Sequence, residues 1–496
     1  MRIKTENRSE RKTGKCTEGI GMALIAIQVI VATILAVKLF KMDVLPVGYL
    51  VTYGIAIVLI NVGVYFAFRK KIPAIIMAII SVIITCGLVY ALIAVVKLDN
   101  TLQKVSADKR LEVVKMSVIV LKDEKAEKLS DIAGTNVGYV TDDKGTQDIK
   151  DIIDGEVKKS VNYTAYNNVL FLADALLNGT ERAIIMNSAY IDVISEQDNY
   201  EDFSNKVREL YTFEVEVQVE EDNAVPEQEV QQEEPYKLSS DENTFVMYIS
   251  GIDTFGSVNV KSRSDVNILA IVNTQTGHIQ LINTPRDYYV MLPEKGAMDK
   301  LTHAGLYGVE SSESAIENLY GIKIDYYLRM NFSGFEEIID TLGGIDVYSE
   351  YDFAVEPVKH YTTGYNHLSG IEALAFARER HAFAAGDIQR GNNQMEVIKA
   401  MINKMTSTDM LTNYSKVLKE ISDCFQTDMP AEVAYDLVKY QLTNGISWRV
   451  DSYSVTGSGE HKTTYSMPNA TCYVMEPNDS DVEQAKQLIE NVLSEK

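Results

Sequence analysis

The first hundred residues consist of long apolar runs separated by short polar breaks. The runs cover residues 20–37, 47–68 and 72–96, and Gln28 and Asn61 are the main polar residues within them. None of the three runs contains a charged residue. Because an α-helix rises about 1.5 Å per residue, each run is long enough to cross a hydrocarbon core about 30 Å thick. The pattern predicts three membrane-spanning helices within residues 20–97, after a basic tail at residues 1–19.

Basic residues gather before the first run and between the second and the third. They are Arg2, Lys4, Arg8, Arg11, Lys12 and Lys15 in the tail, and Arg69, Lys70 and Lys71 in the later break. Lys and Arg in short flanks favour the cytoplasm, so both segments are predicted to lie inside and everything beyond Lys97 outside the cell. A cleaved signal peptide is the alternative for the first run, but two further spans follow closely and no small-residue cleavage site is evident.

Strand-like and helix-like patterns alternate between residues 98 and 219. Val113–Leu121 is rich in β-branched residues, Asp148–Val157 has helical spacing, and Asn168–Leu177 resembles a buried helix. These patterns predict a small α/β domain, and no catalytic constellation is recognisable in it. Residues 220–235 are acidic and contain two prolines but no aromatic residue, which predicts a solvated linker over residues 220–240.

Polar residues stand at the ends of three strand-like runs beyond the linker. Asp253 follows the run at 245–252, Arg263 and Asp265 precede the run at 266–272, and Arg286 follows the run at 278–282. Strand ends beside loops are frequent positions for functional groups. Two aspartates suit a hard divalent cation such as Mg²⁺, which takes one or two carboxylates together with phosphate oxygens. Taken alone, a turn or capping role explains either aspartate equally well.

A second cluster of basic residues lies between residues 378 and 394. Arg378 and Arg380 are two apart, so an extended chain would direct both guanidinium groups to one place. Asp387 is expected to cap an amphipathic helix in which Arg390 and Gln394, four apart, share a face. Guanidinium groups beside a helix N-terminus bind anions well. Surface ion pairs to nearby glutamates are the alternative interpretation.

Composition narrows the class of protein. With 46% hydrophobic and 24% charged residues among 496, and only 10 prolines, the chain is globular and allows two to four domains. Its 47 Lys and Arg against 70 Asp and Glu leave a net charge of −23 and argue against a nucleic-acid partner.

The four cysteines have no metal-binding spacing, and Cys424 and Cys472 are the only pair predicted to be exported; their spacing leaves a disulfide open.

An ordered series of motifs resembles the LytR-CpsA-Psr family of cell-wall proteins, from about Thr244 to the C-terminus. The motifs are GID at 251–253, RSD at 263–265, PRD at 285–287, DKLTHA at 299–304, GGIDV at 343–347, LSGIEALAFARER at 368–380 and GDIQRGNNQ at 386–394. Three spans followed by a smaller exported domain are similar to the capsule-linked and LytR-like branch of that family. The resemblance implies an α/β fold: three transmembrane helices, an accessory α/β domain at 98–219, and an extracellular α/β/α catalytic domain with a central mixed sheet at 241–496.

The resemblance also implies an activity. Such a protein is a membrane-anchored phosphotransferase that moves a glycopolymer, whether capsule, teichoic acid or a related polysaccharide, from a polyprenyl-pyrophosphate carrier to peptidoglycan. The product is a phosphodiester, typically at the 6-hydroxyl of a muramic acid residue. Splitting a pyrophosphate requires neutralisation of the phosphoryl oxygens and a base for the acceptor proton.

Carried over onto this sequence, the family's motifs assign roles to individual residues. Asp253 and Asp265 would hold Mg²⁺ or Mn²⁺, and Asp265 is also the candidate base. The remaining candidates are anion-binding: Arg286, Arg378, Arg380 and Arg390 on the pyrophosphate, with Gln394 in support, and Arg263 and Lys300 as either pyrophosphate contacts or structural ion-pair partners. Apolar strands and the helix beginning at Ile388 would enclose the prenyl tail.

Three other functions remain open on the sequence. A pyrophosphatase would use water in place of the sugar hydroxyl at the same residues. A non-catalytic scaffold would bind the lipid-linked polymer without turning it over. Transcriptional control, which the older naming of the family suggests, finds no DNA-reading element in this chain.

Overall fold

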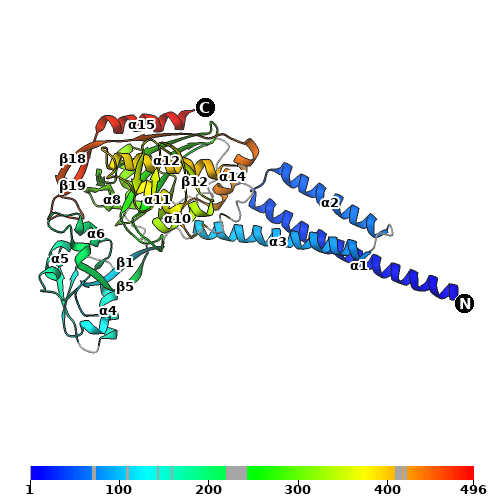
Figure 1. Cartoon of the computed structure of the whole chain (residues 1–496), viewed down its shortest axis with the longest axis horizontal. Helices are drawn as coiled ribbons and strands as arrows, with labels where there is room; N and C mark the ends of the chain where they lie inside the picture. Colours follow the sequence, from blue (N-terminus) through cyan, green and yellow to red (C-terminus); the bar gives the residue numbers. More distant parts are fainter. Residues whose placement is uncertain are drawn as a thin grey trace, which may run out of the picture.

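The computed structural model describes residues 2–69, 74–107, 111–141, 145–157, 160–218, 243–407, 417, 421 and 423–496, so the predicted linker at 220–240 lies outside the described residues. Three long helices, α1 (Arg2–Met42), α2 (Val47–Arg69) and α3 (Ala74–Ala107), form a rod that projects from a globular part (Figure 1). Their segments Gly21–Met42, Val47–Phe66 and Ala78–Lys97 are long and apolar enough to cross a membrane. The three predicted membrane helices are confirmed.

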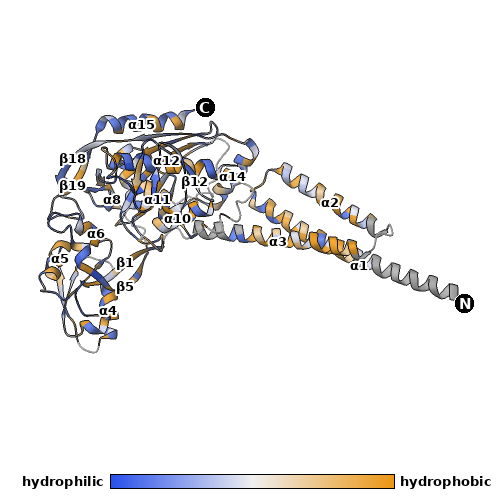
Figure 2. Cartoon of the chain, in the orientation of Figure 1, coloured by the Kyte–Doolittle hydropathy of each residue, from blue (hydrophilic) through white to orange (hydrophobic). Residues whose placement is uncertain are grey.

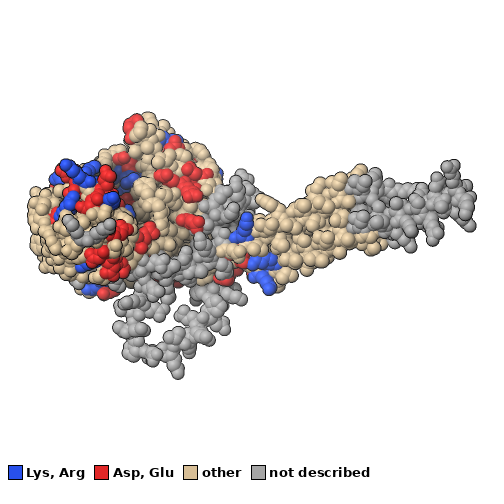
Figure 3. Space-filling view, turned by 90° about the horizontal axis from the view of Figure 1, so that it is seen from below, with Lys and Arg blue, Asp and Glu red and all other residues tan. Residues whose placement is uncertain are grey.

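The surface of the rod has the character of a membrane anchor. The part of the rod whose side chains are described is predominantly hydrophobic (Figure 2), and the charged side chains that are drawn gather on the globular part and where it meets the rod (Figure 3). Inside the rod, the buried Ser81 hydroxyl of α3 donates to Gln28 Oε1 of α1 at 3.0 Å, so a polar contact joins these two helices. At the globular end, Lys38 and Tyr435 both bond to Asp99, which links α1 and α3 to the globular part.

The accessory domain is a five-stranded mixed sheet in the order β3-β2-β4-β1-β5. Strands β2, β3 and β4 run parallel, and β1 is antiparallel to both β4 and β5. Its elements are β1 (Leu111–Leu121), η1 (Leu129–Ile132), β2 (Asn136–Val140), α4 (Thr146–Glu156), β3 (Asn162–Tyr166), α5 (Val169–Leu177), β4 (Ala183–Asn187), α6 (Tyr190–Ser195), α7 (Phe203–Lys206) and β5 (Val207–Gln218). The strand expected near 113–121 and the helices expected near 148–157 and 168–177 are confirmed.

The catalytic domain contains a six-stranded mixed sheet in the order β16-β11-β6-β7-β8-β17. Its elements are β6 (Thr244–Ile252), β7 (Ser264–Asn273), β8 (His278–Asn283), β9 (Tyr289–Leu292), β10 (Ala297–Lys300), α8 (Leu301–Ala304), α9 (Val309–Tyr320), β11 (Tyr326–Asn331), α10 (Phe332–Thr341), β12 (Ile345–Ser349), β13 (Phe353–Val355), β14 (Lys359–Tyr361), β15 (Gly364–Leu368), α11 (Gly370–Arg378), α12 (Asp387–Met405), β16 (Phe425–Thr427), α14 (Ala431–Asn444), β17 (Arg449–Ser454), β18 (Gly457–Lys462), β19 (Cys472–Pro477) and α15 (Asp479–Ser494). Strands β6, β7 and β8 are successive antiparallel neighbours, while β11 pairs parallel with β6 and β17 parallel with β8.

Both faces of this sheet are covered, which explains why its central strands β6 and β7 are largely apolar and buried. Successive strand residues point to opposite faces, so Leu269 packs with Ile316 of α9 and Ile489 of α15. The neighbouring Ile268 packs on the other face, with Met395 of α12. The result is a three-layer α/β/α domain with a central mixed sheet, as expected.

A buried ion cluster joins the accessory domain to the catalytic domain. Glu112 of β1 accepts from Arg329 Nη1 of β11 at 2.9 Å and pairs with Lys261 Nζ at 2.9 Å. Its carboxylate also accepts from the backbone N–H of Val309 at 3.1 Å. Gly308 has φ +122°, and a side chain there would collide with this carboxylate, so glycine permits the close approach. Arg329 is 1% exposed and depends on Glu112 for its neutralisation.

Cys424 and Cys472 are both buried, and the disulfide that the sequence left open is not formed between them. Cys424 belongs to the core that contains Ile338 and Phe376, whereas Cys472 begins β19. Burial raises the pKa of both thiols, which keeps them protonated and unreactive.

We expect Glu112→Ala to destabilise the chain by about 3–5 kcal/mol, because it leaves a buried arginine without its carboxylate. Thermal unfolding of the purified full-length chain in detergent measures the effect. Glu127→Ala removes the same group from an exposed position of the accessory domain and should change stability by no more than about 0.5 kcal/mol. Equal melting temperatures for both variants would contradict the role of Glu112.

Candidate active site

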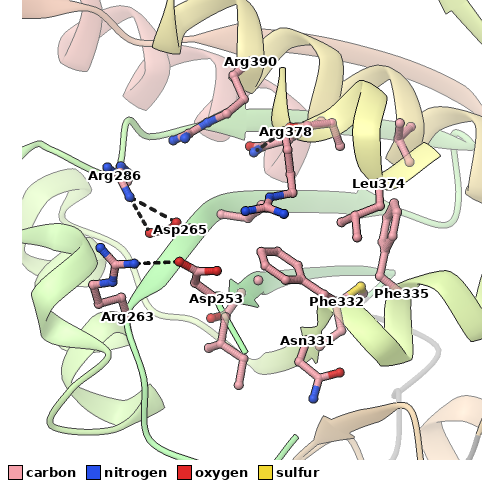
Figure 4. Close-up of a pocket in the computed structure, with 18 of the residues that line it drawn as sticks. Asp253, Arg263, Asp265, Arg286, Asn331, Phe332, Phe335, Leu374, Arg378 and Arg390 are labelled. Atoms are coloured by element: carbon pink, nitrogen blue, oxygen red, sulfur yellow. Dashed lines mark hydrogen bonds and ion pairs between the residues drawn. The ribbon is translucent and has the colours of Figure 1, made fainter. Parts of the chain in front are cut away.

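The antiparallel pairing of β6, β7 and β8 brings the polar strand ends together. The end of β6 lies opposite the start of β7, with Ile252 paired to Ser264 beside a bulge. The end of β8 also lies near the start of β7, with Asn283 paired to Ile268. Asp253, just after β6, Asp265, the second residue of β7, and Arg286, three residues after β8, are therefore neighbours at one edge of the sheet (Figure 4).

Asp265 is held by two partners. Both of its carboxylate oxygens accept from Arg286 Nη1, at 3.0 and 3.1 Å, and Oδ1 also accepts from the Thr302 hydroxyl at 3.0 Å. Burial alone would raise the pKa of Asp265, but the positive charges of Arg286, Arg263 and Arg390 outweigh burial and hold it well below its usual range. Asp265 is ionised at every physiological pH.

Asp253 has the opposite electrostatic character. Its Oδ2 accepts from Arg263 Nη2 at 2.6 Å. Burial and the neighbouring negative charge of Asp265 nevertheless raise the pKa of Asp253 above its ordinary value, since the charge of Arg263 offsets them only in part. The two carboxylates thus share one region but differ in their affinity for a proton.

Helices α11 and α12 supply the second group of cations. A capping box at Ser369 and Glu372 starts α11, and Arg378 is its last residue. The expectation of an extended chain across Arg378 and Arg380 is therefore wrong at Arg378, because the chain leaves the helix only at Glu379, where ψ is 131°. Both side chains are exposed into the cavity, and the Arg378 guanidinium lies 4.3 Å from the centre of the Phe332 ring.

Arg390 occupies the first turn of α12, as expected, but the cap of that helix differs from the prediction. Gly386, with φ +53°, is the capping residue, and Asp387 is the first helical residue. The Asp387 side chain instead pairs with Arg390 Nη2 at 2.7 Å. Burial and the repulsion of Arg286 lower the pKa of Arg390, although Asp387 opposes them. Arg390 is therefore a buried guanidinium that an additional anion would stabilise.

Gln394 and Lys300 take different positions relative to the cavity. Gln394 lines it, and its side-chain amide donates to the carbonyl of Ala377 at 3.3 Å, which ties α12 to α11. Lys300 is 4% exposed, and its Nζ lies 2.8 Å from Asp287 Oδ1 and 2.9 Å from Glu196 Oε2. Among the described residues, those that line the cavity include Arg263 but not Lys300.

Two acidic residues of the accessory domain also line the cavity, and sequence reasoning missed both. Asp192 lies in α6, and Glu196 is the residue directly after the end of that helix. Glu196 accepts from Arg263 Nη1 at 2.7 Å and from Arg286 Nη2 at 3.3 Å. Nothing in the local sequence distinguishes Glu196 from an ordinary glutamate at a helix end, because the contact is made across 67 residues of chain.

The cavity of about 510 Å³ has a charged end and an apolar end. Figure 4 shows Arg263, Arg286, Asp253 and Asp265 on one side and Phe335 and Leu374 on the other, with Arg378 over the Phe332 ring between them. The apolar lining comes from β6, β7, β11 and the helices α10, α11 and α12. Its members are Ile249, Ile252, Val266, Met330, Phe332, Phe335, Leu374, Ala377, Val397, Ile398 and Met401. Such a cavity suits a ligand with an anionic head and a long apolar tail.

The described residues contain no group of three or more His, Cys, Asp or Glu side chains placed to hold a metal ion. Asp253 and Asp265 form a pair of carboxylates, and the pKa of Asp253 is raised first by burial and then by repulsion from the negative charge of Asp265. A divalent cation between them would relieve that repulsion. Two carboxylates are also the number that Mg²⁺ commonly takes from a protein when phosphate oxygens complete its coordination.

Curated relatives match the catalytic domain. The chain is 34% identical over 207 residues to the polyisoprenyl-teichoic acid–peptidoglycan teichoic acid transferase TagU of Bacillus cereus, which covers 42% of this chain and 67% of that protein. It is 32% identical over 232 residues to the protein of the same name from Enterococcus faecalis, which covers 44% of this chain and 76% of that protein. The crystal structure of B. subtilis TagV is 27% identical and covers 51% of this chain and 99% of its own, with a TM-score of 0.44.

The LytR_cpsA_psr family model matches residues 168–488. The match begins within the accessory domain and includes Glu196, whereas the motifs recognised in the sequence start only at Gly251. Because the matched residues make up well over half of the chain, this protein belongs to the LytR-CpsA-Psr family.

Proposed function

We propose that this protein is a membrane-anchored phosphotransferase that moves a glycopolymer from a polyprenyl-pyrophosphate carrier to peptidoglycan, forming a phosphodiester. The observation that carries the proposal is the cavity with a cluster of arginines at one end and an apolar lining at the other. A polyprenyl pyrophosphate has the same division into a polyanionic head and an apolar tail. The names of the relatives, which are teichoic acid–peptidoglycan transferases, support the same reaction.

The apolar end is the proposed site of the prenyl tail. The uncharged side chains of Phe332, Phe335 and Met401 line this end of the cavity. The exported domain also lies directly against the membrane helices (Figure 1). The prenyl chain leaves one apolar environment, the bilayer, for another, so its entry into the cavity exposes little apolar surface to water. The pyrophosphate then lies among the arginines because it is attached to the same lipid.

The proposed reaction is an in-line displacement at the phosphorus that carries the polymer. The acceptor hydroxyl, proposed to be the 6-hydroxyl of a muramic acid residue, forms a new O–P bond as the bridging P–O bond to the prenyl phosphate breaks. Polyprenyl phosphate leaves, and the acceptor proton passes to a carboxylate. Arg286, Arg378 and Arg390 stabilise the negative charge that develops on the phosphoryl oxygens.

The two aspartates are suited to different parts of this reaction. A general base is most effective when its pKa lies near the operating pH. The pKa of Asp253 is raised and that of Asp265 is strongly lowered, so Asp253 accepts a proton more readily than Asp265, the base that the sequence motifs suggest, as long as no cation is bound between them. Asp265 serves best as a permanently charged ligand and as the partner that orients Arg286.

Magnesium, or manganese in its place, is the proposed cofactor. Asp253 and Asp265 would hold the ion, which would neutralise charge on the pyrophosphate when bound. The repulsion between the two carboxylates supports this assignment, since a cation between them would remove it.

We expect the purified full-length chain to transfer glycan from a polyprenyl-pyrophosphate-linked donor to peptidoglycan strands, with loss of activity in EDTA and recovery on adding Mg²⁺. Asp265→Ala should abolish transfer, because it removes both a metal ligand and the partner of Arg286. Mass spectrometry of the peptidoglycan detects the new phosphodiester. Release of free glycan phosphate without a peptidoglycan product would identify a hydrolase, and donor binding without turnover would identify a scaffold; either result contradicts the proposal.

We expect Arg378→Lys and Arg380→Lys each to weaken polyprenyl pyrophosphate binding about tenfold to a hundredfold, because lysine keeps the charge but loses the bidentate fork. Both side chains are exposed, so the melting temperature should not change. Calorimetric titration measures the affinity. Arg449→Lys is the matched control, since Arg449 is exposed at the opposite edge of the sheet, where β8 begins. Parent-like affinity in both variants would show that these arginines do not contact the pyrophosphate.

The proposed orientation places the N-terminus in the cytoplasm and the globular part outside the cell. We expect Ser458→Cys, at an exposed position of β18, to react with a membrane-impermeant maleimide in intact cells. Cys16, which precedes the first span, should react only after the cells are permeabilised. Cys424 and Cys472 are buried and give little background. The reverse labelling pattern would show that the orientation is inverted.

A further inference from the structure

Glu196 is fixed to the accessory domain by the helix that precedes it. It is the C-cap of α6, and its backbone N–H donates to the carbonyl of Asp192 at 3.1 Å. Val193 and Ile194, on the same helix, are fully buried in the core of the accessory domain. The Glu196 side chain, by contrast, points out of that domain and into the cavity of the catalytic domain.

Three cations of the catalytic domain converge on the Glu196 carboxylate. Oε1 accepts from Arg263 Nη1 at 2.7 Å and from Arg286 Nη2 at 3.3 Å. Oε2 accepts from Lys300 Nζ at 2.9 Å. Burial would raise the pKa of Glu196, but the charges of Lys300, Arg286 and Arg263 outweigh it and lower that pKa to about 2. The carboxylate therefore carries a full negative charge at physiological pH.

The two domains are packed together tightly enough to hold Glu196 in this position. Leu306 and Met467 of the catalytic domain are members of the accessory core that surrounds α6. Val113 of β1 makes two backbone hydrogen bonds to the catalytic domain, its N–H donating to the Asn259 carbonyl at 2.9 Å and its carbonyl accepting from the Lys261 N–H at 2.8 Å. The buried Glu112 ion cluster adds a third connection.

We propose that Glu196 is a positioning residue of the active site. The accessory domain supplies this carboxylate, which holds Arg263 and Arg286 in their working orientation and is itself paired with Lys300 through its second oxygen. This inference rests on the proposed function. Arg286 divides its guanidinium between Asp265, through Nη1, and Glu196, through Nη2. Two carboxylates hydrogen-bonded to different nitrogens fix the plane of that group, whereas without Glu196 only the Asp265 bonds to Nη1 and the longer contact of Nε to Asp287, at 3.9 Å, would hold it. The accessory domain thus completes the active site.

A different role would follow if Glu196 occupied the position of a substrate phosphate. In that arrangement the carboxylate would compete with the donor, and its removal would accelerate the reaction. The burial of the contacts and the packing of α6 favour the positioning role, because a competitor has to leave the site in every cycle. Kinetics separate the two roles, since they predict changes of opposite sign in kcat/KM.

The test compares Glu196→Gln with the parent in the full-length chain, using a polyprenyl-pyrophosphate-linked donor and peptidoglycan strands. We expect kcat and kcat/KM per folded molecule to fall roughly tenfold to a hundredfold, because the arginines lose their alignment on the reacting phosphorus. The donor KM should not rise, because removal of a nearby negative charge favours an anionic ligand. Thermal unfolding gives the folded fraction, so that lost stability is not counted as lost turnover. Asp198→Asn is the control: it removes one negative charge from an exposed position two residues away.

A second measurement does not depend on turnover. Modification of arginines by phenylglyoxal, located by mass spectrometry, should increase at Arg263 and Arg286 in folded Glu196→Gln and remain at the parent level in Asp198→Asn. Parent-like kcat and arginine reactivity in Glu196→Gln, or an increase in kcat/KM, would overturn the inference. A parent protein that transfers no glycan would instead refute the proposed function, and the arginine reactivity would still decide whether Glu196 orders these side chains.

Discussion

The active site depends on the neutralisation of buried arginines by carboxylates. Arg263 and Arg286 are 7% and 12% exposed, and a guanidinium at that depth is stable only with a paired anion. Asp253, Asp265 and Glu196 provide that pairing, from two strand ends and from a separate domain. The arrangement keeps positive charge concentrated in an acidic protein, where an unpaired cluster of this kind would be unstable.

The arginines of the site consequently fall into two groups. Arg263 and Arg286 are paired with carboxylates, which hold their side chains in fixed positions. Arg378 and Arg380, at and just beyond the end of α11, are exposed into the cavity. Arg390 is intermediate in character, because it is buried and paired with Asp387 but is repelled by Arg286. A site that combines fixed, paired arginines with exposed arginines can bind a polyanion without first breaking the ion pairs of the fixed ones.

The apolar end of the cavity continues into the contact with the membrane helices. Val397 and Met401 of α12 line the cavity and also belong to a core cluster that contains Met42 and Val44, at the end of α1 and just beyond it. Val95 of α3 packs against the same cluster. One continuous apolar region therefore connects the cavity with the membrane helices. Such a region is suited to a substrate whose lipid tail remains in the membrane while its head group reacts.

Local pattern in the sequence was sufficient for much of this architecture. Uninterrupted apolar runs of about 20 residues have one stable structure in a membrane, so three helices followed from length and polarity alone. Asp253 and Asp265 were identified as neighbours because polar residues at the ends of successive apolar strands meet when the strands pair. Arg390 was placed in the first turn of its helix by the period of the apolar residues after it.

Contacts between distant segments were decided only by the tertiary structure. Glu196 follows an ordinary short helix, and its role arises from contacts with residues 67 to 104 positions away. Lys300 lies behind Glu196 and outside the cavity lining, and Arg378 ends a helix where spacing alone suggested an extended chain. Spacing reports which residues share a face of one element, but burial and pairing of charges depend on which elements pack together. The sequence by itself therefore determined the membrane anchor and the strand ends that carry the aspartates, while packing of the accessory domain determined how the arginines are held.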